Sequence, residues 1–232
     1  VSVSGGNNRI RYFVSGNYFN QDGIIIESGF ERYSARINLD ADINEWFKMG
    51  NSFTISQTDE NITLSDSDDG VIATALRQAP DIPVRNPDGS WAGPTQVAGQ
   101  GAEIDNPIAK AYDRDLNLTR QRVLGNLFGE IKFLKNFTFR SEIGGDLSIT
   151  NNYGFLPTYI YGDRINNINQ GRRQYNQSFY YLFKNFLTYN NSLGKHNFTL
   201  MAGQEAQASN WEFISASRHV FLSNDIQALN TG

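Results

Sequence analysis

Few side chains in this sequence of 232 residues have a type and spacing that could carry out catalysis or hold a metal ion. The two histidines, His196 and His219, have no motif around them, and the absence of cysteine leaves no thiolate metal site. The run from Asp66 to Gly70 faintly resembles a calcium-binding loop. However, Gly70 stands where an acid or amide is needed, and the closing glutamate is missing. We therefore expect no enzyme and no cofactor, and a short helix over 68–78 capped by Ser67 or Asp68.

The charged residues follow another pattern, in which they alternate with apolar residues. From Tyr33 to Ile43 one parity carries Tyr, Ala, Ile, Leu, Ala and Ile, and the other carries polar residues that include Arg36 and Asp40. A β-strand places alternate side chains on opposite faces, so this stretch predicts a strand between an apolar and a charged environment. A turn at 44–46 and a similar returning stretch complete a hairpin. Its strands of about ten residues have the length that crosses a bilayer when tilted.

The same pattern recurs over 123–149 and 179–206, and the chain starts with the end of one strand at Val1 and Val3 and an alternating stretch over 10–19. It predicts an all-β fold, an antiparallel up-and-down segment of a transmembrane β-barrel with about eight strands. We expect an open partial barrel in which neighbouring strands pair in chain order. Charged residues on one parity would face a polar lumen and pair with one another by default, or bind a passing polar substrate: Arg36, Asp40, Glu130, Arg140 and Glu142.

The connections alternate between tight turns and long loops. The tight turns lie at 5–9, 44–46, 134–136 and 190–195, and the longer loops at 23–30, 58–118, 151–173 and from 207 onward. Outer-membrane barrels have short periplasmic turns and long extracellular loops, so 58–118 is expected to be a long extracellular loop. Aromatic residues on the apolar parity lie near both strand ends, as in barrels that meet two membrane interfaces. Other aromatic residues are expected in the loops, where they could contact sugar rings or a lid protein, or simply pack: Trp91, Tyr153, Tyr159, Tyr161 and Trp211.

Composition narrows the alternatives. No window approaches 18 apolar residues, which argues against a transmembrane helix, and the mean hydropathy of -0.46 fits strands with one polar face. A net charge of -4 argues against a nucleic-acid partner. A soluble β-sandwich predicts shorter strands, of about 5–6 residues, and no sorting of loops by length. The remaining rivals are a soluble secreted β-domain that binds glycans and a secreted all-β hydrolase, which would need paired carboxylates in a recognisable context.

Several segments resemble the SusC/RagA family of TonB-dependent outer-membrane transporters. The most specific block spans 12–25 (YFVSGNYFNQDGII) and continues through GFERYS at 29–34 and RINLD at 36–40. Later matches are ALRQAP at 75–80, NPDG at 86–89, NPIA at 106–109 and LTYN at 187–190. The resemblance covers essentially the whole chain.

This resemblance implies a bacterial outer-membrane protein, surrounded by lipid, with about 22 strands around a plug. It also implies import of oligosaccharides or peptides, a SusD-like lipoprotein as a lid, and energy coupling to the TonB complex through an N-terminal part. We expect residues 1–232 to be a partial barrel domain without plug domain or signal peptide, which would transport nothing alone.

Overall fold

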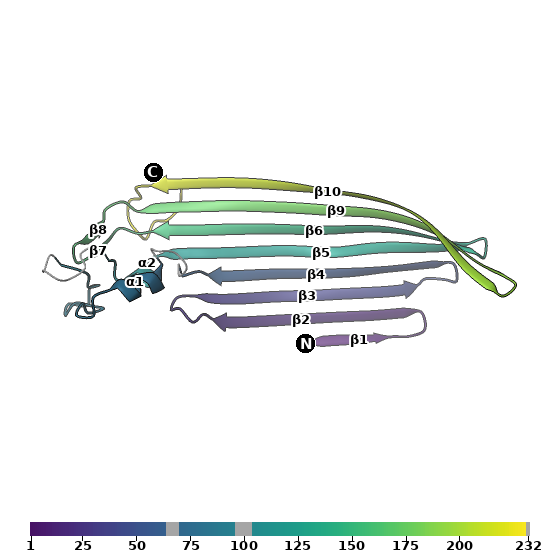
Figure 1. Ribbon diagram of the computed structural model, residues 1–232, viewed down its shortest axis with the longest axis horizontal. Helices are drawn as coiled ribbons and strands as arrows, with labels where there is room; N and C mark the ends of the chain where they lie inside the picture. Colours follow the sequence, from purple (N-terminus) through teal and green to yellow (C-terminus); the bar gives the residue numbers. More distant parts are fainter. Residues whose placement is uncertain (64–69, 96–103, 231–232) are drawn as a thin grey trace.

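The computed structural model describes residues 1–63, 70–95 and 104–230. Eight strands form one antiparallel sheet, while two short helices and a small hairpin gather at one end of it (Figure 1). The elements in chain order are β1 (Ser2–Gly6), β2 (Ile10–Asp22), β3 (Gly29–Asp42), β4 (Phe47–Asn61), α1 (Val71–Arg77), α2 (Pro107–Asp113), β5 (Asp115–Phe133), β6 (Phe137–Leu156), β7 (Tyr159–Tyr161), β8 (Arg164–Asn166), β9 (Gln170–Leu193) and β10 (His196–His219).

The large sheet is open and follows the chain. Its order is β1-β2-β3-β4-β5-β6-β9-β10, so β1 and β10 are the two edges and each pairs with a single neighbour in the described part of the chain. The separate β7–β8 hairpin forms between β6 and β9, which still pair directly with each other. The predicted up-and-down antiparallel arrangement with an open edge on each side is confirmed.

From β2 onward, the strands of the large sheet are longer than the ten residues expected. They lengthen from 13 residues in β2 to 24 in β9 and β10. Tilted strands need only about 9–11 residues to cross a bilayer, so the excess extends beyond it. The long loops shrink accordingly: the loop expected over 58–118 runs from 62 to 114, the loop over 151–173 contains β7 and β8, and the region from 207 to 219 is strand.

Polar residues on both faces explain why these strand ends were missed. Past the apolar stretch, Gln57 donates to Asp59 over 2.9 Å, and Thr119 on the next strand donates to the same carboxylate over 2.8 Å. The second of these bonds joins β5 to β4, and such cross-strand pairs stabilise a sheet whose two faces are both in water. The apolar alternation disappears there, and with it the sequence signal for a strand.

The tight turns all lie at the end opposite the helices (Figure 1). Side-chain oxygens of asparagine close two of them: Asn7 accepts from the backbone amides of Arg9 and Ile10, and Asn44 accepts from those of Trp46 and Phe47. The other two turns use left-handed backbone, with φ of 48° and 61° at Leu134 and Lys135, and 63° at Gly194. Asn and Gly suit these roles at three of the turns, which made those turns visible in the sequence, whereas Leu134 and Lys135 adopt left-handed backbone without such a residue.

The register assigns the two faces of the sheet. Ile37 pairs with Val14 and Phe53 on an apolar face, whereas its neighbour Asn38 pairs with Phe13 and Ser52 on a charged face. Near the tight turns, the apolar face carries a row of rings across three strands: Phe137 lies 5.6 Å from Phe133 and 4.7 Å from Tyr189 between ring centres. Toward the loops it carries two further ring pairs, Tyr18 with Tyr33 and Phe179 with Tyr181. Two aromatic belts bound an apolar band, as at the two interfaces of a bilayer.

Strand stagger gives the tilt. The register aligns Ile10, the first residue of β2, with Gln204 of β10, which lies eight residues after the start of that strand at His196. The tight turns of a barrel lie at one membrane surface, so this stagger measures tilt. Eight residues at about 3.3 Å each, over six spacings of about 4.8 Å, correspond to a tilt of about 40°. Transmembrane barrels have tilts of about 35–45°.

The two helices are short and lie among the loops. α1 begins at Val71, with Gly70 at its N-cap position, where Thr74 donates to the Gly70 carbonyl over 2.7 Å. The expected caps Ser67 and Asp68, and the acidic run from Asp66 to Asp69, lie outside the described residues. Among the described residues, no helix has the length and hydropathy to span a bilayer.

Candidate functional site

The charged face of the sheet brings three of the five predicted lumen residues together. The Arg140 guanidinium lies 3.2 Å from Glu142 and 3.9 Å from Glu130. Asn126 also donates to Glu142, over 2.8 Å. These residues come from β5 and β6, which the register places side by side. The default expectation of mutual pairing therefore holds at this cluster.

Two more ion pairs continue this face toward the loops and the edge. Arg122 binds Asp146 through Nε at 2.8 Å, and Lys184 lies 3.7 Å from Glu205. Each pair joins neighbouring strands. These two pairs neutralise their charges within the wall, and such cross-strand pairs help to hold the strands in register.

The other two predicted residues, Arg36 and Asp40, lie on β3 beside a hollow of about 580 Å³. Arg36 donates from Nε to Asn38 over 3.3 Å. Phe13 and Phe128 line the same hollow. It combines polar groups with two aromatic rings on the charged face.

A compact loop unit lies at the end of the sheet. It comprises residues 70–95, residues 104–114 and the β7–β8 hairpin. It contains several of the most buried side chains among the described residues: Val71, Thr74, Ala92, Pro94, Ala109, Ala111 and Tyr161. A Cβ on Gly93 would lie 2.0 Å from the Tyr161 carbonyl oxygen, which shows how closely the hairpin packs. The described long loop is therefore a folded structure.

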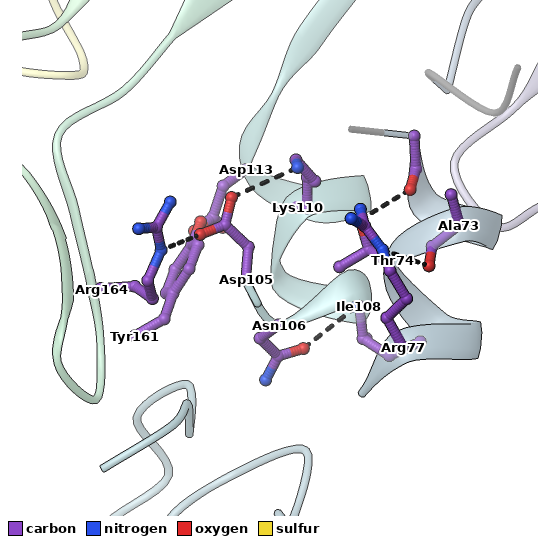
Figure 2. A network of polar contacts seen from close by, with 11 residues as sticks. Ala73, Thr74, Arg77, Asp105, Asn106, Ile108, Lys110, Asp113, Tyr161 and Arg164 are labelled. Atoms are coloured by element: carbon purple, nitrogen blue, oxygen red, sulfur yellow. Dashed lines mark hydrogen bonds and ion pairs between the residues drawn. The ribbon is translucent and has the colours of Figure 1, made fainter. Parts of the chain in front are cut away.

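Asp105 is the polar centre of this unit. Its carboxylate accepts from Arg164 Nε on β8 over 2.9 Å and lies 3.2 Å from Lys110 Nζ on α2 (Figure 2). The side chains of Lys110 and Asp105 are only 2% and 7% exposed. Burying these charges is tolerated because they are paired, so Asp105 joins the helix to the hairpin.

The adjacent Asn106 organises the start of α2. Its side-chain oxygen accepts from the amides of Ile108 and Ala109, and its amide nitrogen donates to the carbonyls of Val84 and Ala92, each over 2.8 Å. An Asn cap followed by Pro at the first helical position is a recognised helix start. That signal was available in the sequence.

Asp113, at the other end of α2, binds two of the predicted aromatic residues. Tyr161 donates its hydroxyl over 2.7 Å and Trp91 donates its indole N–H over 3.2 Å (Figure 2 shows Tyr161 beside Asp113). Burial and the neighbouring Asp113 carboxylate raise the pKa of Tyr161 well above its ordinary value. Sequence reasoning missed the buried Asp105 and the half-buried Asp113, because nothing nearby marks either acid as a hydrogen-bonding centre.

Trp91 and Tyr159 are held by further ring contacts. The Arg85 guanidinium carbon lies 3.6 Å from the Trp91 ring centre, and Tyr112 stacks at 5.8 Å. Tyr159 stacks on Tyr161 at 4.2 Å, with the two planes 9° apart. Three predicted contact residues therefore lie together in the loop unit and take part in its packing.

Tyr153 and Trp211 lie elsewhere, on strands. Tyr153 is near the end of β6, where it contacts Arg173 and Gln227. Trp211 lies within β10, so the expectation of a loop position is wrong. The register places it on the charged face, opposite Ser178. It is 65% exposed and stacks with Phe213, which sequence reasoning missed, at 5.8 Å with planes 3° apart.

Comparison with known proteins shows what the chain resembles. Over 99% of its length, the chain is 31% identical to "TonB-dependent receptor P3" of Formosa agariphila. It is 26% identical to "TonB-dependent receptor SusC" of Bacteroides thetaiotaomicron over 89% of its length. Nearly the whole chain is therefore similar to TonB-dependent receptors of the SusC/RagA type. No family model matches it.

Solved structures of this family agree with the fold. The whole chain matches the RagAB peptide importer in its 'closed-closed' and 'open-open' states, with a TM-score of 0.77 and 25% identity in each case. It covers 26% of that chain, and 23% and 22% of the two curated relatives. The chain thus spans about a quarter of the length of the SusC/RagA proteins that it matches.

The resemblance indicates the environment of the sheet. TonB-dependent receptors of the SusC/RagA type are outer-membrane proteins of Gram-negative bacteria, and the sheet matches part of such a barrel. We infer that its apolar face meets the membrane and that its charged face lines the barrel lumen. The soluble secreted alternatives are wrong for this chain. The relatives it matches are receptors and transporters, not enzymes.

Proposed function

We propose that the complete protein imports large polar nutrients, oligosaccharides or peptides, across the outer membrane. This chain would contribute part of the barrel wall and part of the extracellular loops. The main support is that the entire chain matches one part of a peptide importer, over both the long strands and the loops between them. In this proposal a SusD-like lipoprotein covers the loops, and the TonB complex supplies energy through an N-terminal part of the complete protein.

The lumen wall suits a polar cargo that is bound weakly. Arg140, Arg122 and Lys184 each lie against a carboxylate of the same wall. At these three positions the wall presents hydrogen-bonding groups whose charge is already paired, so they would bind a polar substrate only weakly. Arg36 and Asp40, beside the hollow, are the wall residues that we favour for substrate contact.

Trp211 and Phe213 are the aromatic residues best placed to touch the cargo. They lie on the lumen face of β10, with near-parallel rings that are 65% and 44% exposed. Flat apolar rings suit either the faces of sugars or the side chains of peptides. In contrast, Trp91, Tyr159 and Tyr161 already pack within the loop unit, so we assign them to its rigidity.

The lid would contact the outer side of the β7–β8 hairpin. Ile160 and Ile165 face each other across this hairpin and are 68% and 57% exposed. Two adjacent exposed isoleucines outside the membrane form an apolar surface typical of protein contacts. The rigid loop unit behind them would present this surface in one fixed orientation.

Uptake by the full-length protein tests the role of the lumen. We expect Trp211→Ala to lower uptake of a labelled oligosaccharide or peptide pool severalfold, with unchanged amounts of barrel in the outer membrane. Trp46→Ala is the matched control, because Trp46 is similarly exposed, at 55%, but lies beside a tight turn. Equal uptake by the two variants would remove Trp211 from the proposal.

Lid association is tested separately. Replacing Ile160 and Ile165 by Asp should reduce the lipoprotein recovered with the purified barrel, while Ile24→Asp should not. Ile24 is fully exposed in the β2–β3 loop and so controls for the added charge. Unchanged recovery with the double variant would exclude this hairpin as the lid contact.

A further inference from the structure

A second hollow lies on the charged face of the sheet, at the end where the helices and the long loops gather. Its volume is about 450 Å³, and it lies over the loop ends of β5, β6, β9 and β10 (Figure 1 shows these ends on the side of the helices). Leu116 and Leu156 form part of its wall. Its polar lining comes from β9 and β10: Gln170, Arg172, Ser215, Ser217 and His219.

The register explains why this place is hollow. One aligned row on the charged face runs from Leu116 of β5 through Gly154 of β6 and Arg172 of β9 to Ser217 of β10. Gly154 has no side chain, and the serine is small. The sheet surface is therefore low on both sides of Arg172, whose side chain is exposed.

The segment after β10 covers the opposite face of the same strands. The Phe221 ring centre lies 5.4 Å from that of Phe155, and a Cβ on Gly171 would lie 2.7 Å from the same Phe221 ring. Arg218 donates to the Leu229 carbonyl over 3.3 Å. Residues 155, 171 and 218 alternate along their strands with residues of the hollow, so this packing leaves the hollow open toward the charged side.

Positive charge is unbalanced on this part of the charged face. Between the Arg122–Asp146 pair and the loops, the described strands β5, β6, β9 and β10 place Arg120, Arg172 and His219 on that face, but no Asp or Glu. Arg172 donates one long hydrogen bond, of 3.4 Å, to a serine hydroxyl of β10. It has no carboxylate partner among the described contacts, unlike Arg122. Its remaining N–H groups are therefore available to a ligand.

The donors of the second hollow suit a carboxylate or a sulfate. A guanidinium presents N–H groups in one plane, which matches the oxygens of such anions and gives strong, charge-assisted hydrogen bonds. The hydroxyls of Ser215 and Ser217 and the amide of Gln170 can donate to the same anion. The lining contains no carboxylate, so a cationic ligand would find no partner of opposite charge there.

The exposed ring pair of β10 leads into this hollow. Trp211 and Phe213 lie on the same face as Ser215 and Ser217, and successive residues on one face are about 7 Å apart along a strand. Ser178 and Asn176 of β9 lie opposite the two rings. Rings flanked by hydroxyl and amide groups suit sugar units, which have apolar faces and polar edges.

We propose that the second hollow binds a carboxylate or sulfate group of an acidic oligosaccharide entering the barrel. Arg172 would hold the anion, the two serines would donate to it, and Trp211 and Phe213 would support neighbouring sugar rings. An oligosaccharide fits better than a peptide, because peptides commonly carry both signs of charge and this part of the wall offers only positive charge. The inference rests on the proposed import function and specifies its cargo.

The test measures which compounds the purified full-length protein retains. The probes are a mixed pool of carboxylated and sulfated oligosaccharides from polysaccharide digests, the same pool after carboxyl reduction and desulfation, and a pool of acidic peptides of similar length. We expect the untreated oligosaccharides to be retained best, and less so as salt is added. Arg172→Gln should lower their retention about tenfold, because a hydrogen-bonded charge pair is lost, and leave the neutral pool unchanged. Arg173→Gln is the matched control, since Arg173 follows directly on β9 but lies over the Tyr153 ring on the opposite face.

Uptake by cells with the full-length protein separates this inference from the proposed function. Equal retention of the charged and neutralised pools, unchanged retention by Arg172→Gln, or better retention of the acidic peptides would overturn the anion site. Import of neutral oligosaccharides or of peptides, unaffected by Arg172→Gln, would then still support the proposed function. Failure of the wild-type protein to import any of the three pools would overturn both.

Discussion

The guanidinium carbon of Arg140 lies 3.7 Å from the centre of the Phe128 ring on the neighbouring strand. The same guanidinium reaches Glu142 and Glu130, so one side chain joins a ring and two carboxylates on the lumen wall. Arg suits this position because its planar group stacks on a ring while its N–H groups point outward to acceptors.

Arg140→Lys therefore keeps the charge but loses the stacked contact. We expect the full-length barrel to lose about 0.5–1 kcal/mol of stability, the usual size of a partly exposed cation–π contact. Urea titration followed by the shift in gel mobility of the folded barrel measures this change. Phe128→Leu should cost a similar amount and add little to Arg140→Lys, since both remove the same contact. Fully additive losses would contradict this reading.

The assignment of the two faces is tested on β3. Ile37 lies on the apolar face and is 48% exposed, whereas Asn38 lies on the charged face, where Ser52 donates to its side-chain oxygen over 2.8 Å. Ile37→Arg should impair barrel assembly by about 2–4 kcal/mol, the cost of Arg near the bilayer midplane. Asn38→Arg should be tolerated. The folded fraction is measured from the heat-dependent gel mobility of the barrel in outer membranes. Equal damage from both changes would contradict the assignment of Ile37 and Asn38 to opposite faces of the sheet.

Asp105 should hold the loop unit together. Asp105→Ala removes the carboxylate shared by buried Lys110 and by Arg164, and breaking such a pair costs about 3–5 kcal/mol. We expect faster hydrogen exchange across α2 and the β7–β8 hairpin, while the barrel still inserts. Asp88→Ala is the control, because Asp88 lies in an exposed turn and binds only its neighbour Ser90 among the described contacts. Unchanged exchange after Asp105→Ala would show that packing alone holds the unit.

Tyr161 should make the loop unit sensitive to alkali. Its pKa is raised in the folded state, first by burial and then by Asp113, so the folded protein favours the protonated phenol. Its contribution to stability is fully present below the unfolded pKa of about 10 and is lost as the pH rises above that value. Hydrogen exchange of the hairpin should therefore accelerate above about pH 10. We expect Tyr161→Phe to weaken the increase in exchange rate with pH. Tyr112→Phe, at a half-exposed position, should leave that increase unchanged.

The sequence determined the sheet through local rules. Alternation around Ile37 and Asn38 assigned the faces, Asn44 marked a tight turn, and the sorting of connections by length separated the two ends of the barrel. Each of these signals comes from residues close together in the chain. Strand ends were misjudged where the signal stopped: beyond the membrane both faces of a strand meet water, so Trp211 was assigned to a loop although it lies in β10.

The loop unit was decided by tertiary structure alone. Asp105 and Arg164 are far apart in the chain, as are Trp91 and Asp113, and no periodicity links them. A buried ion pair depends on how helix and hairpin meet, which the sequence does not encode locally. The polar residues Ser141, Asn185 and Gln204 depend likewise on register, because they become neighbours on one face of the sheet only when β6, β9 and β10 align. Alternation of side chains is a property of one strand, whereas burial and cross-strand contact require the partner strands to be in place.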